Sequence, residues 1–144
     1  MGIELTARVR AIPVARTAED VAWLAGRLAK FFAGATNAIY APVGGDENPV
    51  TVLQDVEART VWMPEDAGLI MRTSGSTTGS GRLVGLSAAQ MRASAAATEA
   101  RLGGPCSWVL ALAPHHIAGL QVVARALLSE REVVTCAVSY THLT

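Results

Sequence analysis

The sequence predicts an α/β fold: a layered, partly parallel sheet with flanking helices. In the second half of the chain, short apolar segments alternate with helical patterns, which is the order found in parallel sheets. Hydrophobic residues make up 51% of the 144 residues and charged residues only 17%, so the chain has enough apolar material for a core. The length corresponds to one domain or part of one.

The first clear helical pattern covers residues 17–34. Thr17 and Asp20 resemble a capping box, with Asp in place of the usual Glu or Gln. Gly34 is expected to end this helix. Apolar residues recur at three- and four-residue spacing and form one stripe: Val21, Leu24, Leu28 and Phe31.

Three shorter segments follow this helix. Residues 38–43 are apolar and predict a strand. Residues 44–49, with the sequence GGDENP, predict a turn or a surface loop. Residues 50–56 alternate weakly between apolar and polar side chains, which favours a second strand.

The most regular part begins at Gly68. We expect a strand over 68–74, a loop of only Gly, Ser and Thr over 74–81, and a strand over 82–87. Ser87 and Gln90 then form a capping box, and the helix that they begin runs to about residue 102.

The remaining chain predicts a strand, a helix and a strand. Residues 106–113 form an apolar run suited to a strand buried on both faces. A helix is expected over 115–130, and a last strand starts near Glu132. The apolar face of that helix comprises Ile117, Leu120, Val123 or Ala124, and Leu127.

Charge and composition exclude several classes of function. The 12 basic and 12 acidic residues give zero formal net charge, and only 5% of residues are aromatic, so we expect no nucleic-acid partner. There is no apolar run long enough to span a membrane and no secretory signal, which favours a cytoplasmic location. Cys106 and Cys136 lack metal-ligand spacing, so we expect two ordinary thiols and no metal site built from protein ligands.

The last seven residues, 138–144, do not read as native protein. VSYTHLT can be back-translated into DNA that contains a transposon end used as a sequencing adapter. We therefore expect residues 1–137 to be the native part, with the loop and sheet core at 68–137.

The Gly/Ser/Thr loop has the chemistry of a phosphate site. Glycines allow successive backbone N–H groups to converge on an anion, hydroxyls add neutral donors, and the guanidinium of Arg82 can pair with a phosphate. Neither common phosphate motif fits, because no Lys follows at the required spacing and the helix begins only after a second strand. A flexible surface hairpin explains the composition equally well.

A resemblance favours the phosphate site. MRTSGSTTGSGRLVGLS resembles the signature loop of the adenylate-forming superfamily, with Thr78 as a one-residue insertion. The usual Pro is absent, and Arg82 stands at the Lys position, which keeps the charge but changes its shape. The resemblance implies that the loop holds the ATP β- and γ-phosphates, and the residues concerned are Thr73, Ser74, Gly75, Ser76, Thr77, Thr78, Gly79 and Arg82.

A second resemblance lies about 35 residues downstream. Pro114, His115, His116 and Gly119 match a family element in which a strand is followed by P-x-H-H-x-x-G at a helix start. The family gives the second histidine a place against the acyl-adenylate, so we expect that role for His116. Two ligands to one metal from adjacent helical residues are disfavoured, because their side chains point about 100° apart. Simple capping and packing is the other structural explanation for the pair.

The sequence over residues 68–134 looks most like that of actinobacterial o-succinylbenzoate–CoA ligases of menaquinone biosynthesis. The resemblance implies that Mg²⁺-bound ATP converts a carboxylic acid into an acyl-adenylate, from which the CoA thiol displaces AMP. The adenine, ribose and late Lys motifs of the family are not found, so we expect a fragment that is inactive alone. Two alternatives stay open: a stand-alone, non-catalytic nucleotide- or phosphate-binding module, and a hydrolase built on Cys106 and the histidine pair.

Overall fold

The computed structural model describes residues 8–60, 62–73 and 81–136. Helices and strands alternate through most of this length, as the sequence predicts. In chain order the elements are β1 (Val9–Val14), α1 (Ala18–Phe32), β2 (Ile39–Gly44), α2 (Pro49–Arg59), β3 (Ala67–Arg72), β4 (Leu83–Ser87), α3 (Ala88–Leu102), β5 (Trp108–Leu110), α4 (Ile117–Leu128) and β6 (Val133–Thr135).

The strands form two sheets. The larger has the order β1-β2-β3-β4, in which β1, β2 and β3 are parallel and β4 is antiparallel to β3. The smaller consists of β5 and β6, which are parallel. The α/β class with a partly parallel sheet is confirmed, and the parallel pairing extends into the first half of the chain, beyond what the pattern predicted.

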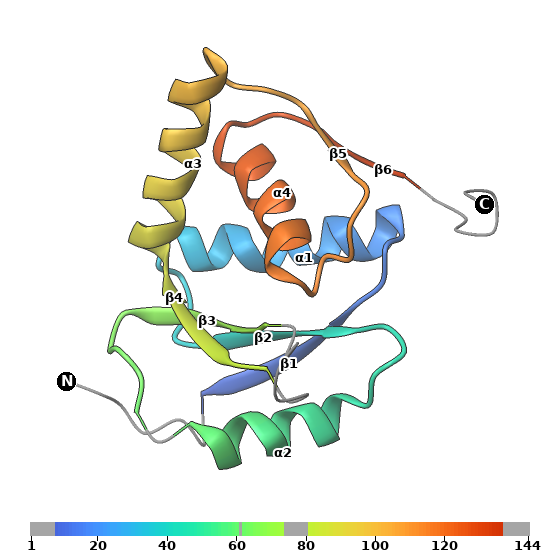
Figure 1. Ribbon diagram of the computed structural model, residues 1–144, viewed down its shortest axis with the longest axis vertical. Helices are drawn as coiled ribbons and strands as arrows, with labels where there is room; N and C mark the ends of the chain where they lie inside the picture. Colours follow the sequence, from blue (N-terminus) through green and yellow to red (C-terminus); the bar gives the residue numbers. More distant parts are fainter. Residues whose placement is uncertain (1–7, 61, 74–80, 137–144) are drawn as a thin grey trace.

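Helices cover both faces of the larger sheet (Figure 1). On one side α1 and α4 pack over a core that includes Leu24, Leu28, Leu69 and Leu120, all fully buried. On the other side α2 closes a second, smaller core around Val56 and other buried residues. Because β1, β2 and β3 are parallel, their carboxyl ends lie at the same edge of this sheet.

Helices α1 and α3 begin at their predicted N-cap residues, Thr17 and Ser87. The Thr17 hydroxyl accepts the Asp20 N–H at 3.1 Å, although the Asp20 carboxylate accepts from Ala15 and not from Thr17. Ser87 and Gln90 form a reciprocal capping box with distances of 2.9 and 3.1 Å.

Two expectations about secondary structure are wrong, and one strand was missed. Residues 50–56 lie in helix α2, because Asn48 caps the N–H groups of Val50 and Thr51 and Pro49 occupies the first turn. Strand β1 was not anticipated. The apolar run 106–113 contributes only the short strand β5, whose Val109 is 61% exposed instead of buried on both faces.

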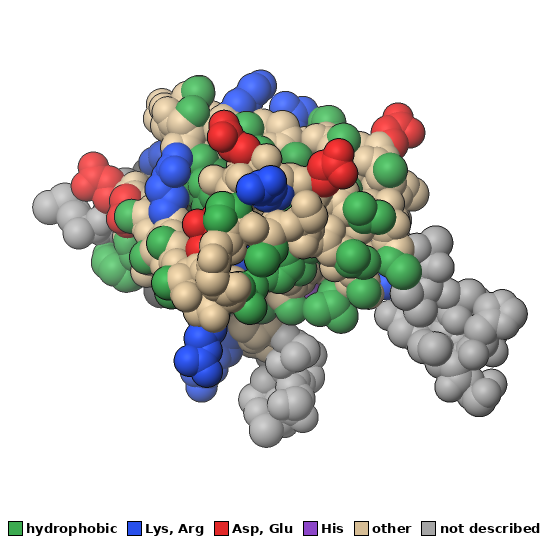
Figure 2. Space-filling view, turned by 90° about the horizontal axis from the view of Figure 1, so that it is seen from above, with side chains coloured by type: hydrophobic (Ala, Val, Ile, Leu, Met, Phe, Trp, Pro, Cys, Tyr) green, Lys and Arg blue, Asp and Glu red, His purple; other side chains and the backbone are tan. Residues whose placement is uncertain are grey.

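Apolar side chains remain exposed among charged ones on the face seen in Figure 2. The larger exposed apolar side chains include Val109 of β5 and Val134 of β6. No helix in the described part of the chain combines the length and the apolar run that a membrane crossing requires.

Candidate phosphate-binding site

The two ends of the Gly/Ser/Thr loop are held together as an antiparallel pair. The Thr73 N–H donates to the Arg82 carbonyl at 2.9 Å, and the Arg82 N–H donates to the Thr73 hydroxyl at 2.9 Å. Arg59 of α2 donates to the Gly81 carbonyl at 2.8 Å. The strands predicted on either side of the loop are confirmed as β3 and β4. Between these ends, several candidate residues lie outside the described part of the chain: Ser74, Gly75, Ser76, Thr77, Thr78 and Gly79.

A charged cluster next to the loop was not anticipated. Glu47, in the turn after β2, accepts both outer N–H groups of Arg72, at 2.6 and 2.8 Å. It also accepts the Gly44 N–H at 2.8 Å. Because Arg72 directly precedes Thr73, this carboxylate connects the carboxyl end of β2 to the start of the loop.

The pKa values of this pair move in the directions that such contacts require. The hydrogen bonds from Arg72, reinforced by the Gly44 N–H and by the charges of Arg72 and His115, outweigh burial and lower the pKa of Glu47 to about 2. The same hydrogen bond to Glu47 raises the pKa of Arg72. The pair is therefore fully charged at neutral pH and leaves no charge of Arg72 unmatched.

The histidine pair lies at the start of α4. His116 is the N-cap residue and is exposed, and its side chain makes no capping hydrogen bond. The motif glycine has a packing reason: a Cβ at Gly119 would lie 2.1 Å from the Ala113 carbonyl oxygen. Arg16, which follows β1, donates to the Ala111 carbonyl at 3.0 Å and ties this segment to the same edge of the sheet.

His115 brings the histidine pair to the charged cluster. Its Nε2 lies 3.8 Å from a carboxylate oxygen of Glu47, and its ring packs so closely on Gly44 that a Cβ there would be 2.9 Å from Cε1. The centroids of the His115 and His116 rings are 4.1 Å apart. Burial lowers the pKa of His115, the charge of His116 adds to this, and Glu47 opposes it. His115 therefore favours its neutral form.

Cys106 lies away from this cluster. It lines a small crevice together with Arg125 and Ser129, which belong to the C-terminal end of α4. The histidines lie at the other end of this 12-residue helix, about 18 Å away at the usual rise. A Cys–His pair is therefore not assembled, and the described residues hold no group of three side chains suited to a metal.

The fold is that of the N-terminal portion of an adenylate-forming enzyme. The chain superposes on o-succinylbenzoate coenzyme A synthetase (MenE) from Bacillus subtilis, solved with ATP and a magnesium ion, with a TM-score of 0.65 and 15% identity. The same synthetase with the acyl-adenylate OSB-AMP gives a TM-score of 0.66 and 16% identity. These matches cover 95% of this chain and 46% and 45% of the synthetase chains.

The particular proteins that it resembles in sequence are 2-succinylbenzoate–CoA ligases. A stretch of 65 residues is 49% identical to a probable 2-succinylbenzoate–CoA ligase of Mycobacterium tuberculosis. The stretch is 45% of this chain and 17% of that relative. No protein-family model matches the chain. The predicted resemblance to this group of acid–CoA ligases is thus confirmed.

Proposed function

We propose that this chain is the N-terminal portion of an ATP-dependent acid–CoA ligase acting on o-succinylbenzoate. In this proposal the carboxylate of the acid attacks the α-phosphate of Mg²⁺-bound ATP and expels pyrophosphate, and the CoA thiol then displaces AMP from the acyl-adenylate. The same proposal includes a cytoplasmic location. It also holds that the native part of this chain ends at residue 137 and that the isolated fragment is inactive.

One observation carries this proposal. Residues about 40 positions apart in sequence, Thr73 and His115, are brought to one edge of the sheet through Glu47, which contacts both Arg72 and His115. A polyphosphate in the loop would therefore have the start of α4 as a neighbour, where a helix N-terminus favours negative charge.

Each candidate residue has a role in this arrangement. The loop from Thr73 to Gly79 would hold the β- and γ-phosphates, with Arg82 as a charge partner. Arg82 is exposed, so its guanidinium can reach a ligand from the loop exit. His116, exposed at the N-cap of α4, would contact the adenylate or acyl group. With Arg72 matched by Glu47, Arg82 is the guanidinium to which we assign the phosphate.

Calorimetric titration with Mg²⁺-ATP tests the phosphate site. We expect Arg82→Ala to weaken binding at least tenfold and Arg82→Lys to weaken it less, because Lys keeps the charge without the bidentate geometry. Arg101→Ala, an exposed substitution in the last turn of α3, is the matched control. Equal affinities for Arg82→Ala and wild type would contradict the assignment.

Two measurements separate this proposal from a stand-alone binding module. The 144-residue chain should form no acyl-CoA from acid, ATP and CoA, whereas measurable turnover would contradict the fragment. The source DNA should be sequenced across codons 130–144 and onward. A frame that continues beyond codon 137 for several hundred codons supports the ligase, and a gene that ends at codon 144 favours the module.

A further inference from the structure

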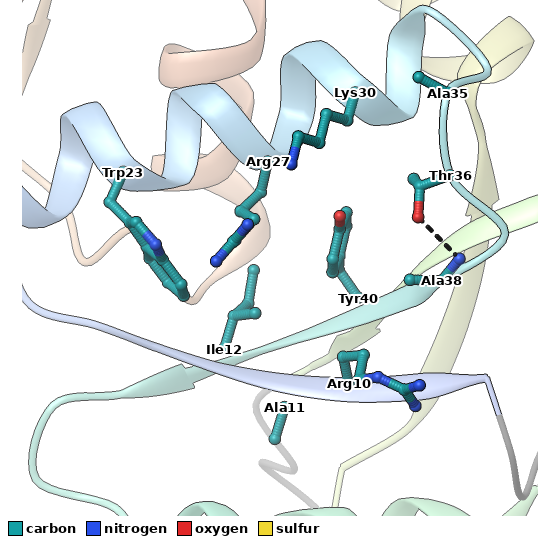
Figure 3. A pocket seen from close by; sticks show the side chains of 10 residues that line it. All are labelled: Arg10, Ala11, Ile12, Trp23, Arg27, Lys30, Ala35, Thr36, Ala38 and Tyr40. Carbon is teal, nitrogen blue, oxygen red and sulfur yellow. Dashed lines mark hydrogen bonds between the residues drawn. The ribbon is translucent and has the colours of Figure 1, made fainter.

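A hollow elsewhere in the molecule shares no residue with the candidate phosphate-binding site. It has a volume of about 530 Å³ and opens between α1, the start of β1 and the start of β2 (Figure 3). Tyr40 lies near the start of β2 and Gly44 at its end, so the two sites are about 13 Å apart along the strand. A volume of this size suits a small molecule.

The hollow is positively charged. Three basic residues line it, Arg10 from β1 and Arg27 and Lys30 from α1, and its lining includes no acidic residue. Within the described part of the chain, neither Arg27 nor Lys30 forms an ion pair. A cleft lined by one sign of charge concentrates the electric field and attracts counter-ions.

The helix geometry explains how these groups come together. Trp23, Arg27 and Lys30 follow one another at four- and three-residue spacing, so they form one side of α1. The Arg27 guanidinium lies 4.6 Å from the centre of the Trp23 ring. Stacking on this ring restrains the guanidinium through its flat face and leaves its N–H edge available for hydrogen bonds.

Neutral polar groups complete the opposite wall. In Figure 3 the Tyr40 hydroxyl points up from the sheet toward α1, between Arg27 and Thr36. The Thr36 hydroxyl accepts the Ala38 N–H at 3.0 Å, so its own proton is free to be donated outward. Across from the sheet, the ammonium of Lys30 points into the same space. Cationic and hydroxyl donors thus converge from both walls.

We propose that this hollow binds the diphosphate group of a small molecule, at a site separate from the candidate loop. Two linked phosphates match the spread of cations along α1, and an attached flat ring could lie beside the half-exposed Trp23. The shared chemistry is the diphosphate, which a nucleotide or inorganic pyrophosphate can supply.

Nuclear magnetic resonance titrations of the ¹⁵N-labelled chain locate the binding. We add ADP in one titration and inorganic pyrophosphate in another. In both, we expect the resonances of the Trp23 indole N–H and of the Thr36 and Ala38 amides to shift together as the ligand concentration rises. The double variant R27Q/K30Q should weaken this response at least tenfold. Higher salt should weaken it as well, because the attraction is electrostatic.

The controls distinguish this site from the loop. Arg82→Gln should leave the shifts at Thr36 unchanged even if it removes those near Thr73, and Arg101→Gln should change neither. Thermal unfolding of R27Q/K30Q should match wild type, since these side chains are not in the core. An absence of shifts in the hollow at millimolar ADP and pyrophosphate, or equal shifts in R27Q/K30Q, would overturn the proposal.

Discussion

Glu47 accepts both outer N–H groups of Arg72, at 2.6 and 2.8 Å, across the ends of two neighbouring parallel strands. Both side chains are partly buried, at 32% and 22% exposure, so solvent screens the pair less than a surface pair. We expect a double-mutant cycle with Glu47→Gln and Arg72→Met to give a coupling free energy of about 1–3 kcal/mol.

Urea unfolding of the four proteins measures this coupling. Asp55→Asn is the control, because Asp55 forms an exposed i,i+4 pair with Arg59 and should change the free energy of unfolding by only about 0.5 kcal/mol. A coupling free energy at Glu47–Arg72 below about 0.5 kcal/mol, the level of an exposed pair, would show that the pair does not brace the start of the loop.

Acid should weaken the protein through Glu47. Its pKa is about 2 in the folded chain, below the ordinary value of 4.5, so its stabilising contribution is present above pH 4.5 and is lost as the pH falls toward 2. Carbon-13 shifts of the side-chain carboxyl report the titration directly. In Arg72→Met the midpoint should move up toward 4.5, and a wild-type midpoint near 4.5 would contradict the geometry.

His115 predicts a second pH dependence in a higher range. Burial lowers its pKa below 6.5, so the unfolded chain binds a proton there that the folded chain does not. The free energy of unfolding should therefore fall as the pH decreases from 6.5 toward the folded pKa. Proton shifts of the His115 ring should give a midpoint below 6.5, and His115→Gln should flatten the stability profile in this window. A midpoint above 6.5 would be inconsistent with a buried, neutral ring.

Two helical glycines should respond oppositely to alanine. A Cβ at Gly119 would meet the Ala113 carbonyl, which belongs to the backbone and cannot rotate away. Gly119→Ala should therefore lower the free energy of unfolding by about 1–3 kcal/mol. Gly26 in α1 has no atom within 4 Å of that position, and Gly26→Ala should stabilise the protein by roughly 0.5–1 kcal/mol. Thermal unfolding of both variants checks the contrast, and equal effects would refute it.

Local signals were sufficient where a pattern and a cap agreed. The stripe at Leu24 and Leu28 together with Thr17 predicted α1, and Ser87 predicted the start of α3. The pattern failed for α2, because the weak alternation over residues 50–56 favours a strand, whereas Asn48 and Pro49, inside the predicted loop, start a helix. It also failed for β1, an edge strand that tolerates Arg10 and Pro13 and therefore shows no alternation.

The candidate site was predictable only in part. The loop and the histidines each carry a local motif, which is why they could be found in the sequence. Glu47 and Arg72 are 25 residues apart and meet because β2 and β3 lie side by side. The sequence offers only a hint: an acidic residue just after one buried strand and a single Arg at the end of the next. The two residues can be recognised as a pair only once the strand order is known.

The uncapped start of α4 also sets a limit on protein engineering. An Asp or Ser at position 116 would supply the acceptor that the His116 side chain does not provide, with a gain of about 0.5–2 kcal/mol. The same N–H groups are the ones that a bound anion at the candidate site would use. A variant selected only for heat resistance would thus tend to accept this substitution and lose affinity for its ligand, so thermostability and ligand recognition compete at a single residue.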